Sequence, residues 1–338
     1  MLHLCQAGYE GLLERELVEL RGAKVAEKGA GWVLEKSAAE DGLKQRTTLA
    51  FAHVSMGGVV EVRGETVNAL AQKVAEFFLG SLRGERIEAA WPNVWDGPGE
   101  MVGLGRRVAS VETAFLELLK RKLSRVAKLA AAERPRGVGV ARGLWVWFVD
   151  FGRAFVAREA WQHGPRRMAD DPLAPSRSFL KVEEAYLVSG CEPAAGETVC
   201  DLGAAPGGWS YSAAKRGARV VAVDNGPLKG GAKDHASIEH RREDAFKFSP
   251  EDDAAFDWLF CDMVEDPRHV LHHIVEPWLD RGWCRRLVVN LKFGRVDPVA
   301  LLKELEGNAI LKERAEGLAV RHLYHDREEF TIVGAVRR

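Results

Sequence analysis

The stretch VCDLGAAPGGW, from Val199 to Trp209, decides the fold of the second half of this chain. Its apolar beginning predicts a strand at 198–202, which runs into a glycine-rich turn and then into a helix. Such a turn places free backbone N–H groups of a helix N-terminus at the carboxyl edge of a sheet, where α/β proteins bind ligands. Asp224 ends the next predicted strand and can accept hydrogen bonds from both hydroxyls of a ribose. Because Ala205 and Pro206 interrupt the GxGxxG spacing, we do not expect a dinucleotide pyrophosphate here.

Strands and helices alternate regularly around this stretch. The last two strands are joined by the short polar turn His325–Arg327, so they must be antiparallel, because parallel neighbours need a long crossover. The alternation predicts an α/β fold in which helices cover both faces of a mostly parallel sheet. We expect strands at Thr198–Leu202, Arg219–Asp224, Asp257–Cys261, Leu287–Leu291, Ala319–Tyr324 and Phe330–Val336, and helices at Ser178–Ser189, Trp209–Lys215, His269–Leu279 and Val299–Glu316.

The first 160 residues have a different pattern, typical of a smaller α+β domain. Three prolines, Pro165, Pro172 and Pro175, follow this domain and prevent a helix from continuing. We therefore divide the 338 residues into an N-terminal region at 1–160, a linker at 161–175 and a C-terminal domain at 176–338. Within the N-terminal region we expect strands near Leu2–Cys5, Lys24–Glu27, Trp32–Glu35, Ile87–Trp91, Leu144–Val149 and Ala154–Ala157, and helices at Tyr9–Leu20 and Asn68–Leu79.

A strongly basic stretch lies in the N-terminal region, from Arg106 to Arg142. It contains ten Lys or Arg and three Glu, a local charge of +7 in a chain whose net charge is −1. Apolar residues recur in it at helical spacing, which predicts a long amphipathic helix with its cations facing solvent, among them Lys120, Arg121, Arg125 and Lys128. This face either binds nucleic acid or is only a solvated surface, and the pattern favours neither.

The second half of the chain contains five informative segments, namely DLGAAPGGW with VDNG (Val223–Gly226), SRSFLK (Ser176–Lys181), CDM (Cys261–Met263), NLK (Asn290–Lys292) and REEFT (Arg327–Thr331). Together they resemble S-adenosylmethionine-dependent methyltransferases, specifically the FtsJ-like ribose 2′-O-methyltransferases. The resemblance implies a Rossmann-like class I methyltransferase with a seven-stranded, mostly parallel sheet. Ala205 stands where that family commonly has cysteine, which should matter little because the loop contributes mainly backbone groups.

Four further segments, REDAFKF, CDMVEDP, RGWC and LYHDREE, narrow the resemblance to one group within this family. They resemble the bacterial enzymes that methylate a cytidine 2′-hydroxyl in 23S rRNA and carry a THUMP RNA-binding domain in their N-terminal half. The match is specific from about Ala169 to Thr331 and loose over the first 160 residues. It implies an RNA substrate, 23S rRNA or its precursor, and a THUMP-like domain within residues 1–160.

The resemblance also implies roles for individual residues. The catalytic tetrad would consist of Lys181, Asp262, Lys292 and Glu329, with Glu328 competing for the last position. S-adenosylmethionine would be the cofactor, with Asp224 on its ribose and Asp244 on its adenine amino group, although Asp244 could instead cap a short helix. The full set of expected cofactor contacts is Ser178, Gly203, Ala205, Pro206, Gly207, Gly208, Asp224, Asp244 and Asp262.

Such a tetrad suits the reaction. A ribose 2′-hydroxyl is a poor nucleophile unless its proton is removed as it attacks the methyl group. A lysine is a useful base only where its ammonium form is disfavoured. We expect the positive charges of Lys181 and of the cofactor's sulfonium to push Lys292 toward its neutral form. Asp262 acts in the opposite direction and would orient Lys292, while Glu329 would hold Lys181.

Composition excludes several other classes of protein. Five scattered cysteines without a CxxC pair argue against a zinc ribbon and a disulfide framework, and the histidines show no convincing metal spacing, so we expect no metal. The longest strongly apolar stretch, Leu144–Val149, is far shorter than a membrane span of about 20 residues. No export signal is visible at the N-terminus. We therefore expect a cytoplasmic protein without a membrane partner, and nothing implies an obligate protein partner.

Other functions remain open. An enzyme that methylates exocyclic amines should have an Asn/Asp-Pro-Pro-aromatic segment where this chain has Cys261-Asp262-Met263-Val264. A small-molecule O-methyltransferase would not need a basic N-terminal region or two lysines in its site. The main alternatives are a 2′-O-methyltransferase of another RNA and a catalytically silent RNA-binding protein; an NAD-dependent enzyme could be excluded by cofactor competition.

Overall fold

The computed structural model describes residues 1–36, 48–251 and 254–337. They form two compact units, Met1–His163 and Gly164–Arg338, each described below by itself. The expected linker is shorter at its start, because the last strand of the first unit continues to His163.

The first unit is built on a nine-stranded sheet. Its order is β2-β3-β1-β4-β9-β8-β6-β7, with β5 paired to β9. The strands are β1 (Leu2–Leu4), β2 (Val25–Gly29), β3 (Trp32–Glu35), β4 (Val54–Gly57), β5 (Val60–Arg63), β6 (Trp91–Asp96), β7 (Ala130–Ala131), β8 (Val138–Phe148) and β9 (Arg153–His163), and the helices are α1 (Glu10–Arg15) with the π-helical turn η1 (Glu16–Leu20), α3 (Val67–Leu82), α4 (Leu104–Lys122) and α5 (Ser124–Lys128).

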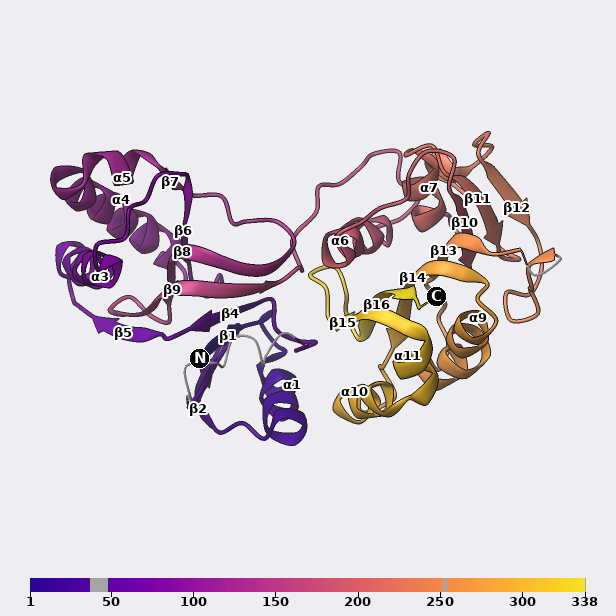
Figure 1. Cartoon of the computed structure of the whole chain (residues 1–338), viewed down its shortest axis with the longest axis horizontal. Helices are drawn as coiled ribbons and strands as arrows, with labels where there is room; N and C mark the ends of the chain where they lie inside the picture. The colour runs from indigo at the N-terminus through magenta and orange to yellow at the C-terminus, as the bar shows by residue number, and fades with distance from the viewer. Residues whose placement is uncertain (37–47, 252–253, 338) are drawn as a thin grey trace. The chain divides into compact units, whose positions relative to one another are not determined.

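Helices α3 and α4 lie together on this sheet, as Figure 1 shows. Phe78 of α3 and Phe115 of α4 are fully buried, and both rings pack against aromatic residues of β6. The expected strand near Ile87–Trp91 was wrong: the strand begins at Trp91, where the indole ring stacks on Phe78. Burial of these aromatic rings therefore fixes the position of the basic helix on the sheet.

The basic stretch is not one long helix, as the sequence had led us to expect. Helix α4 ends at Lys122, because Leu123 leaves helical geometry with φ −140° and ψ 68°, and α5 ends at Lys128. Arg142 lies on β8, where it pairs with Glu85 and Glu159. The cations of the stretch are therefore divided between two helices and the strand that follows.

The second unit is the expected seven-stranded, mostly parallel sheet, in the order β12-β11-β10-β13-β14-β16-β15. Only β16 runs against its neighbours. The strands are β10 (Thr198–Leu202), β11 (Arg219–Val223), β12 (Ile238–Arg241), β13 (Phe256–Cys261), β14 (Cys284–Lys292), β15 (Ala315–Arg321) and β16 (Glu329–Val336), and the helical segments are α6 (Phe179–Ser189), α7 (Gly208–Ala214), η2 (Gly230–Ala232), α8 (Pro267–Val270), η4 (Leu271–Val275), α9 (Glu276–Asp280), α10 (Pro298–Gly307) and α11 (Ala309–Arg314).

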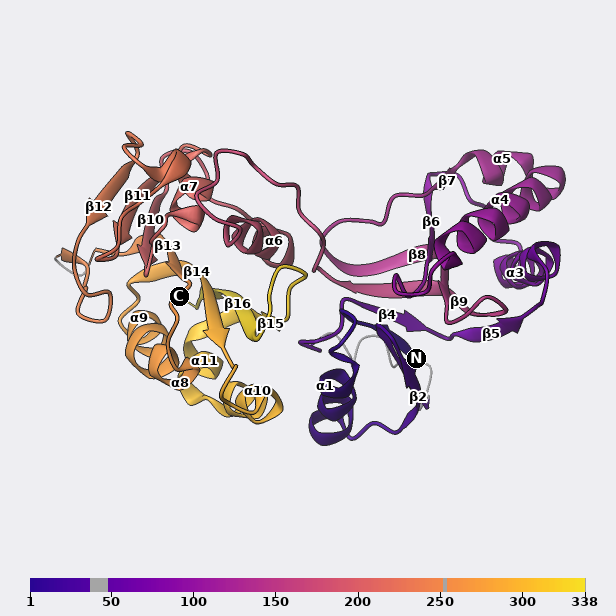
Figure 2. The same ribbon diagram turned by 180° about the vertical axis from the view of Figure 1, so that it is seen from behind.

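Helices cover both faces of this sheet, and Figure 2 shows the same layers from behind. On one face, α6 and α7 pack against Trp258 and Phe260 of β13. On the other face, Leu259 and Cys261 of the same strand are fully buried. Where β13 begins, Trp278 of α9 packs against Phe256. The sheet is thus buried on both sides, and the ligand-binding edge expected for such a fold is the one at which the parallel strands end.

Candidate active site

The four residues of the expected tetrad meet at the carboxyl edge of the second unit's sheet. Lys292 ends β14, Asp262 follows β13, and Glu329 begins the reversed strand β16. Lys181 comes from the first turns of α6. All four side chains are mostly buried, with exposed fractions between 7% and 22%.

Two carboxylates bridge the two lysines. Lys292 Nζ donates to Asp262 Oδ1 at 2.7 Å and to Glu329 Oε2 at 2.8 Å. Lys181 Nζ lies 2.5 Å from Glu329 Oε1 and 3.6 Å from Asp262 Oδ2. Each carboxylate therefore offers one oxygen to each lysine, which fixes both ammonium groups in a closed ring of alternating charge.

The antiparallel register of β14 and β16 explains why Glu329 and not Glu328 joins this ring. Lys292 is the register partner of Glu329, and their side chains leave the sheet on the same face. Glu328 is exposed, and its carboxylate lies beside Gly294. The sequence alone left both residues open because it does not give the register.

The charges in the ring shift the affinity of its groups for protons. Burial acts to lower the pKa of Lys292, but the carboxylates of Asp262 and Glu329 outweigh it and raise that pKa above its usual value. Burial acts to raise the pKa of Glu329, but both lysines outweigh it and lower that pKa. The expected push of Lys292 toward its neutral form is therefore absent in the protein alone, because two carboxylates face one neighbouring lysine.

The glycine-rich loop runs between β10 and α7 beside the tetrad. Gly203 has φ +74° and Gly207 has φ +106°, conformations that L-residues rarely adopt. A Cβ on Gly203 would collide with Met263 Cγ, and one on Gly207 would come within 2.5 Å of the Ala232 side chain. Glycine is thus required at both positions by the backbone and by the close packing around it.

Asp224 lies at the end of β11 and holds this loop. Its Oδ2 accepts the N–H of Ala205 at 2.9 Å, and its Oδ1 accepts the N–H of Gly226 at 2.7 Å. Each carboxylate oxygen keeps a further lone pair, so the side chain can also accept hydrogen bonds from a ribose. The loop and Asp224 are therefore placed as a cofactor site in this fold requires.

The other expected cofactor residues are spread around the loop. Ser178 lies against it, since a Cβ on Gly208 would come within 2.9 Å of Ser178 Oγ, and Pro206 lies inside it. Asp244 is farther out: its side chain is 45% exposed and accepts the N–H of Phe246 at 3.0 Å. Asp244 therefore stabilises a turn in this structure, and no helix begins there, unlike the short helix that its sequence context had offered as an alternative to an adenine contact.

Asp201, the first residue of the DLG motif at the end of β10, was not assigned a role from the sequence. It is fully buried and accepts a 2.6 Å hydrogen bond from Ser210 Oγ. Burial, with smaller contributions from Asp262 and Asp224, raises the pKa of Asp201 to about 7. The signal that could have found it is its position, an acid inside an apolar strand immediately before the loop.

The first unit carries the exposed cations of α4 and α5. Five of them, Lys120, Arg121, Lys122, Arg125 and Lys128, are exposed and form no ion pair with any described residue. Arg107, in contrast, donates to the carbonyl oxygens of Phe151 and Glu65. We call these five residues the basic end of α4–α5.

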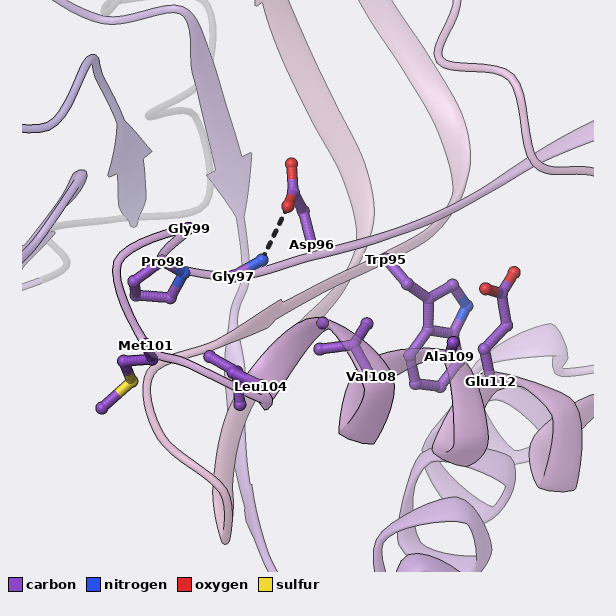
Figure 3. A pocket seen from close by; sticks show the side chains of 11 residues that line it. Trp95, Asp96, Gly97, Pro98, Gly99, Met101, Leu104, Val108, Ala109 and Glu112 are labelled. Carbon is purple, nitrogen blue, oxygen red and sulfur yellow. Dashed lines mark hydrogen bonds between the residues drawn. The ribbon is translucent and has the colours of Figure 1, made fainter.

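A pocket of about 310 Å³ also lies in the first unit, between the start of α4 and the chain that follows β6 (Figure 3). Leu104 and Val108 form its apolar side, and Trp95 and Glu112 stand at one end. Burial raises the pKa of Glu112, and Asn93 donates to its carboxylate at 2.8 Å. None of the residues expected from the sequence to form the site lines this pocket.

The described residues contain neither a metal-binding cluster nor a helix that could span a membrane. Across 1–36, 48–251 and 254–337, no three His, Cys, Asp or Glu side chains group as they would to hold a metal ion. No helix in the same part of the chain combines the length and apolar character needed to cross a bilayer.

Comparisons with known proteins identify relatives of this chain. The family model of the FtsJ-like methyltransferases matches residues 174–329. A ribosomal RNA large subunit methyltransferase M from Laribacter hongkongensis is 33% identical over 343 residues, which covers 95% of this chain and 89% of that protein. Proteins of the same name from Halorhodospira halophila and Xanthomonas oryzae are each 32% identical over 98% of this chain, covering 95% and 98% of their own lengths.

Proposed function

Because the chain belongs to the family of ribosomal RNA large subunit methyltransferase M and is an RNA methyltransferase that uses S-adenosylmethionine, we propose that it methylates the ribose 2′-hydroxyl of a cytidine in 23S rRNA. The observation that carries this proposal is the closed ring of Lys181, Asp262, Lys292 and Glu329. A hydroxyl needs a base when it attacks a methyl group, whereas an exocyclic amine needs polar acceptors, and this site offers two lysines. The names of the relatives support large-subunit rRNA as the substrate. The resemblance carried by the segments REDAFKF, CDMVEDP, RGWC and LYHDREE supports cytidine as the target nucleotide.

In this proposal Lys292 is the general base. The bound cofactor supplies an electrophilic methyl group on a positively charged sulfur. Lys292 Nζ would accept the proton that the 2′-hydroxyl loses as its oxygen takes up this methyl group. Lys292 must first lose its own proton, so the rate should rise with pH as Lys292 becomes neutral. Lys181 and Glu329 would orient the hydroxyl and Lys292, and Asp262 would stabilise the ammonium that forms.

The first unit would supply most of the binding affinity for RNA. A target nucleotide must leave its stack for its ribose to reach a methyl donor, and this costs energy that contacts elsewhere must offset. The basic end of α4–α5 offers five exposed cations without ion pairs for contacts to phosphate. We assign residues 1–163, including a THUMP-like domain, to RNA binding on this basis.

The decisive experiment replaces Lys292, the proposed general base. Lys292→Ala should abolish methyl transfer to rRNA while the dissociation constant of S-adenosylmethionine changes less than about twofold, because a base acts on the transition state. Lys303→Ala, an exposed lysine on α10, is the matched control and should keep full turnover. Turnover above about a tenth of wild type in Lys292→Ala would contradict general-base catalysis, which is worth roughly 10²–10⁴.

A second experiment tests the acceptor. An RNA substrate whose target nucleotide carries a 2′-deoxyribose should receive no methyl group, and any methylation of it would rule out the ribose. Mass-spectrometric mapping of 2′-O-methyl nucleotides in rRNA from cells with and without the gene should show one missing site. A missing site in another RNA would favour the alternative substrate, and no missing site would favour a silent RNA-binding protein.

A further inference from the structure

A chain of buried polar side chains leads away from the tetrad into the core of the second unit. It runs from Asp262 through Asn290 and Thr331 to Asp326. Asn290, Thr331 and Asp326 are 0%, 1% and 2% exposed. Asn290 Nδ2 lies 3.1 Å from Asp262 Oδ1, Thr331 Oγ 2.6 Å from Asn290 Oδ1, and Asp326 Oδ2 3.0 Å from Thr331 Oγ.

The register of β14 and β16 brings these polar side chains together. Asn290 and Thr331 are register partners, two residues along from the partners Lys292 and Glu329. Because side chains alternate between the faces of a strand, both pairs leave the sheet on the same side. The pairing that assembles the tetrad therefore also places a second polar pair directly behind it.

The donors and acceptors that these side chains offer determine which group donates in each hydrogen bond of the series. Asp262 is held by two lysines and acts as an acceptor, so Asn290 must present its NH₂ group to it and its carbonyl oxygen to Thr331. The single hydroxyl proton of Thr331 then goes to Asn290. Thr331 can therefore only accept from Asp326, which requires Asp326 to carry a proton.

The surroundings of Asp326 favour that proton. Its Oδ2 accepts the N–H of Leu323 at 2.9 Å. Burial, followed by the negative charge of Glu329, raises the pKa of Asp326 well above its usual range; Glu184 acts in the same direction and Lys181 against it. An ionised Asp326 would compete with Asn290 for the Thr331 proton and leave the amide of Asn290 free to turn its oxygen toward Asp262.

We propose that Asp326, Thr331 and Asn290 form a positioning network that acts through Asp262 to set how readily Lys292 releases its proton. The proposal rests on the proposed function, in which Lys292 is the base. The N–H group of Asn290 stabilises the negative charge on Asp262 Oδ1, the same oxygen that binds Lys292 at 2.7 Å. It thereby weakens the hold of Asp262 on the Lys292 proton and keeps the carboxylate turned toward both lysines.

The charged groups around Lys292 determine whether loss of the network makes Lys292 hold its proton to a higher or a lower pH. Asp262 faces it from the end of β13 and Glu329 from β16, while Lys181 of α6 binds the other oxygens of both carboxylates. Loss of the Asn290 bond leaves Asp262 a stronger acceptor, so Lys292 should hold its proton to a higher pH. The rising limb of the rate against pH should then move up, and turnover at neutral pH should fall.

The test uses the full-length protein and the variant Thr331→Val, which keeps the shape of the side chain and removes its hydroxyl. We expect kcat at pH 7 to fall about tenfold or more, as loss of one charge-assisted hydrogen bond would produce. The rising limb of the kcat–pH profile should move up by about one pH unit. The KM for RNA and the dissociation constant of S-adenosylmethionine should change less than about twofold, and Thr331→Ser should restore kcat and profile.

Thr198→Val is the matched control. It also removes a threonine hydroxyl that bonds an aspartate, Asp257 at 3.1 Å, but at the opposite end of the parallel strands. A merely structural effect of losing such a bond would appear in both variants, whereas Thr198→Val should keep the wild-type pH profile. Should Thr331→Val fail to fold, Asn290→Ala with the same measurements decides the question.

The outcomes separate the two proposals. If Lys292→Ala is inactive and the Thr331 and Asn290 variants keep the wild-type kcat and pH profile, the positioning network is wrong and the proposed function stands. If Lys292→Ala retains turnover, the proposed function fails first. Lysine side-chain NMR gives an independent reading, since the titration of Lys292 in Asn290→Ala should move to higher pH, and an unchanged titration would overturn the network.

Discussion

Asp224 shows how one side chain can serve both the backbone and a ligand. It accepts two loop N–H groups in the protein alone, from Ala205 and Gly226. These bonds fix the carboxylate where the ribose of the cofactor is expected, so the loop and the ligand depend on the same residue. Loss of Asp224 should therefore weaken binding more than loss of one ligand contact would.

Asp224→Ala should reduce the affinity for S-adenosylmethionine by about tenfold to over a hundredfold, since each hydrogen bond to a charged group contributes roughly 1.5–3 kcal/mol. Isothermal titration calorimetry measures this directly. Asp224→Asn, which keeps an acceptor oxygen, should lie between wild type and alanine. Glu313→Ala, an exposed acid on α11, is the control and should bind normally. Equal affinities in all four proteins would remove Asp224 from the cofactor site.

Asp201 makes the stability of the second unit depend on pH. Its pKa is raised to about 7, whereas an unfolded aspartate has a pKa of about 3.9. As pH rises from about 4 to 7, the unfolded chain releases the proton first, so the free energy of unfolding should fall by up to about 1.4 kcal/mol per pH unit and level off above pH 7. Asp201→Asn removes this contribution, so its stability relative to wild type should rise across that range.

Urea unfolding at pH values between 4.5 and 8 tests this prediction. Asp280→Asn is the control, since that carboxylate is 56% exposed and pairs with Arg314 at the surface. Parallel pH dependences of wild type and Asp201→Asn would mean that Asp201 is ionised in the folded protein.

At the scale of elements, five exposed cations of the first unit gather on both sides of the break between α4 and α5. The basic end of α4–α5 lies around Leu123, where the helix changes direction, while Arg134 and Arg142 are engaged in bonds elsewhere. Binding of RNA by this segment should be dominated by phosphate contacts, and these depend on salt.

Replacing Lys120, Arg121, Arg125 and Lys128 by glutamate should raise the KM for RNA about tenfold or more and reduce the slope of log affinity against log salt. Affinity for S-adenosylmethionine should stay unchanged. The matched control makes the same four charge reversals on exposed cations of the second unit, Arg281, Arg285, Lys303 and Lys312. If both quadruple variants lose RNA affinity equally, net charge and not this segment is responsible.

The sequence predicted the elements of the second unit well because its central strands are apolar runs bounded by glycine or acids. Thr198–Leu202 was predicted with its observed bounds. Strand β12 was missed because Ile238–Arg241 reads IEHR, an edge strand without an apolar pattern. The long basic helix was wrong because helical spacing continues across Leu123 although the backbone does not.

The candidate site was predictable as a set of residues but not as an arrangement. The resemblance of the segments SRSFLK, CDM and NLK to the FtsJ-like family implied Lys181, Asp262 and Lys292. The distances that decide their charges come from register and burial, which one sequence does not contain. For this reason the raised pKa of Lys292 and the role of Asn290 emerged only from the fold.

At the scale of the whole molecule, each unit has its own buried core. Phe78 and Phe115 belong to a cluster of the first unit, and Trp209, Trp258 and Phe260 to a cluster of the second. The glycine-rich loop between β10 and α7 and the expected tetrad lie entirely in the second unit, while the basic end of α4–α5 lies in the first. Binding of the small ligand and binding of RNA should therefore be separable.

Scanning calorimetry of the full chain should show two unfolding transitions, of which S-adenosylmethionine raises only one. At a hundred times its dissociation constant a ligand stabilises its site by about 2.7 kcal/mol, a shift on the order of 5–10 °C for a unit of this size. Asp224→Ala at the same concentration should show a much smaller shift. A single transition that moves as a whole would show that the two units unfold cooperatively.

The pairing of β14 with β16 holds Lys292 and Glu329 together whatever the length of the chain between them. Seven register pairs, from Arg286 with Ala335 to Lys292 with Glu329, fix the two side chains opposite each other. Helices α10 and α11 lie between these strands in sequence but take no part in the pairing. Residues could be inserted or deleted where α10 meets α11, at Asn308, without moving Lys292 relative to Glu329. Relatives of this protein should accordingly differ most in length on that helical side, and a grafted peptide there should leave methyl transfer intact.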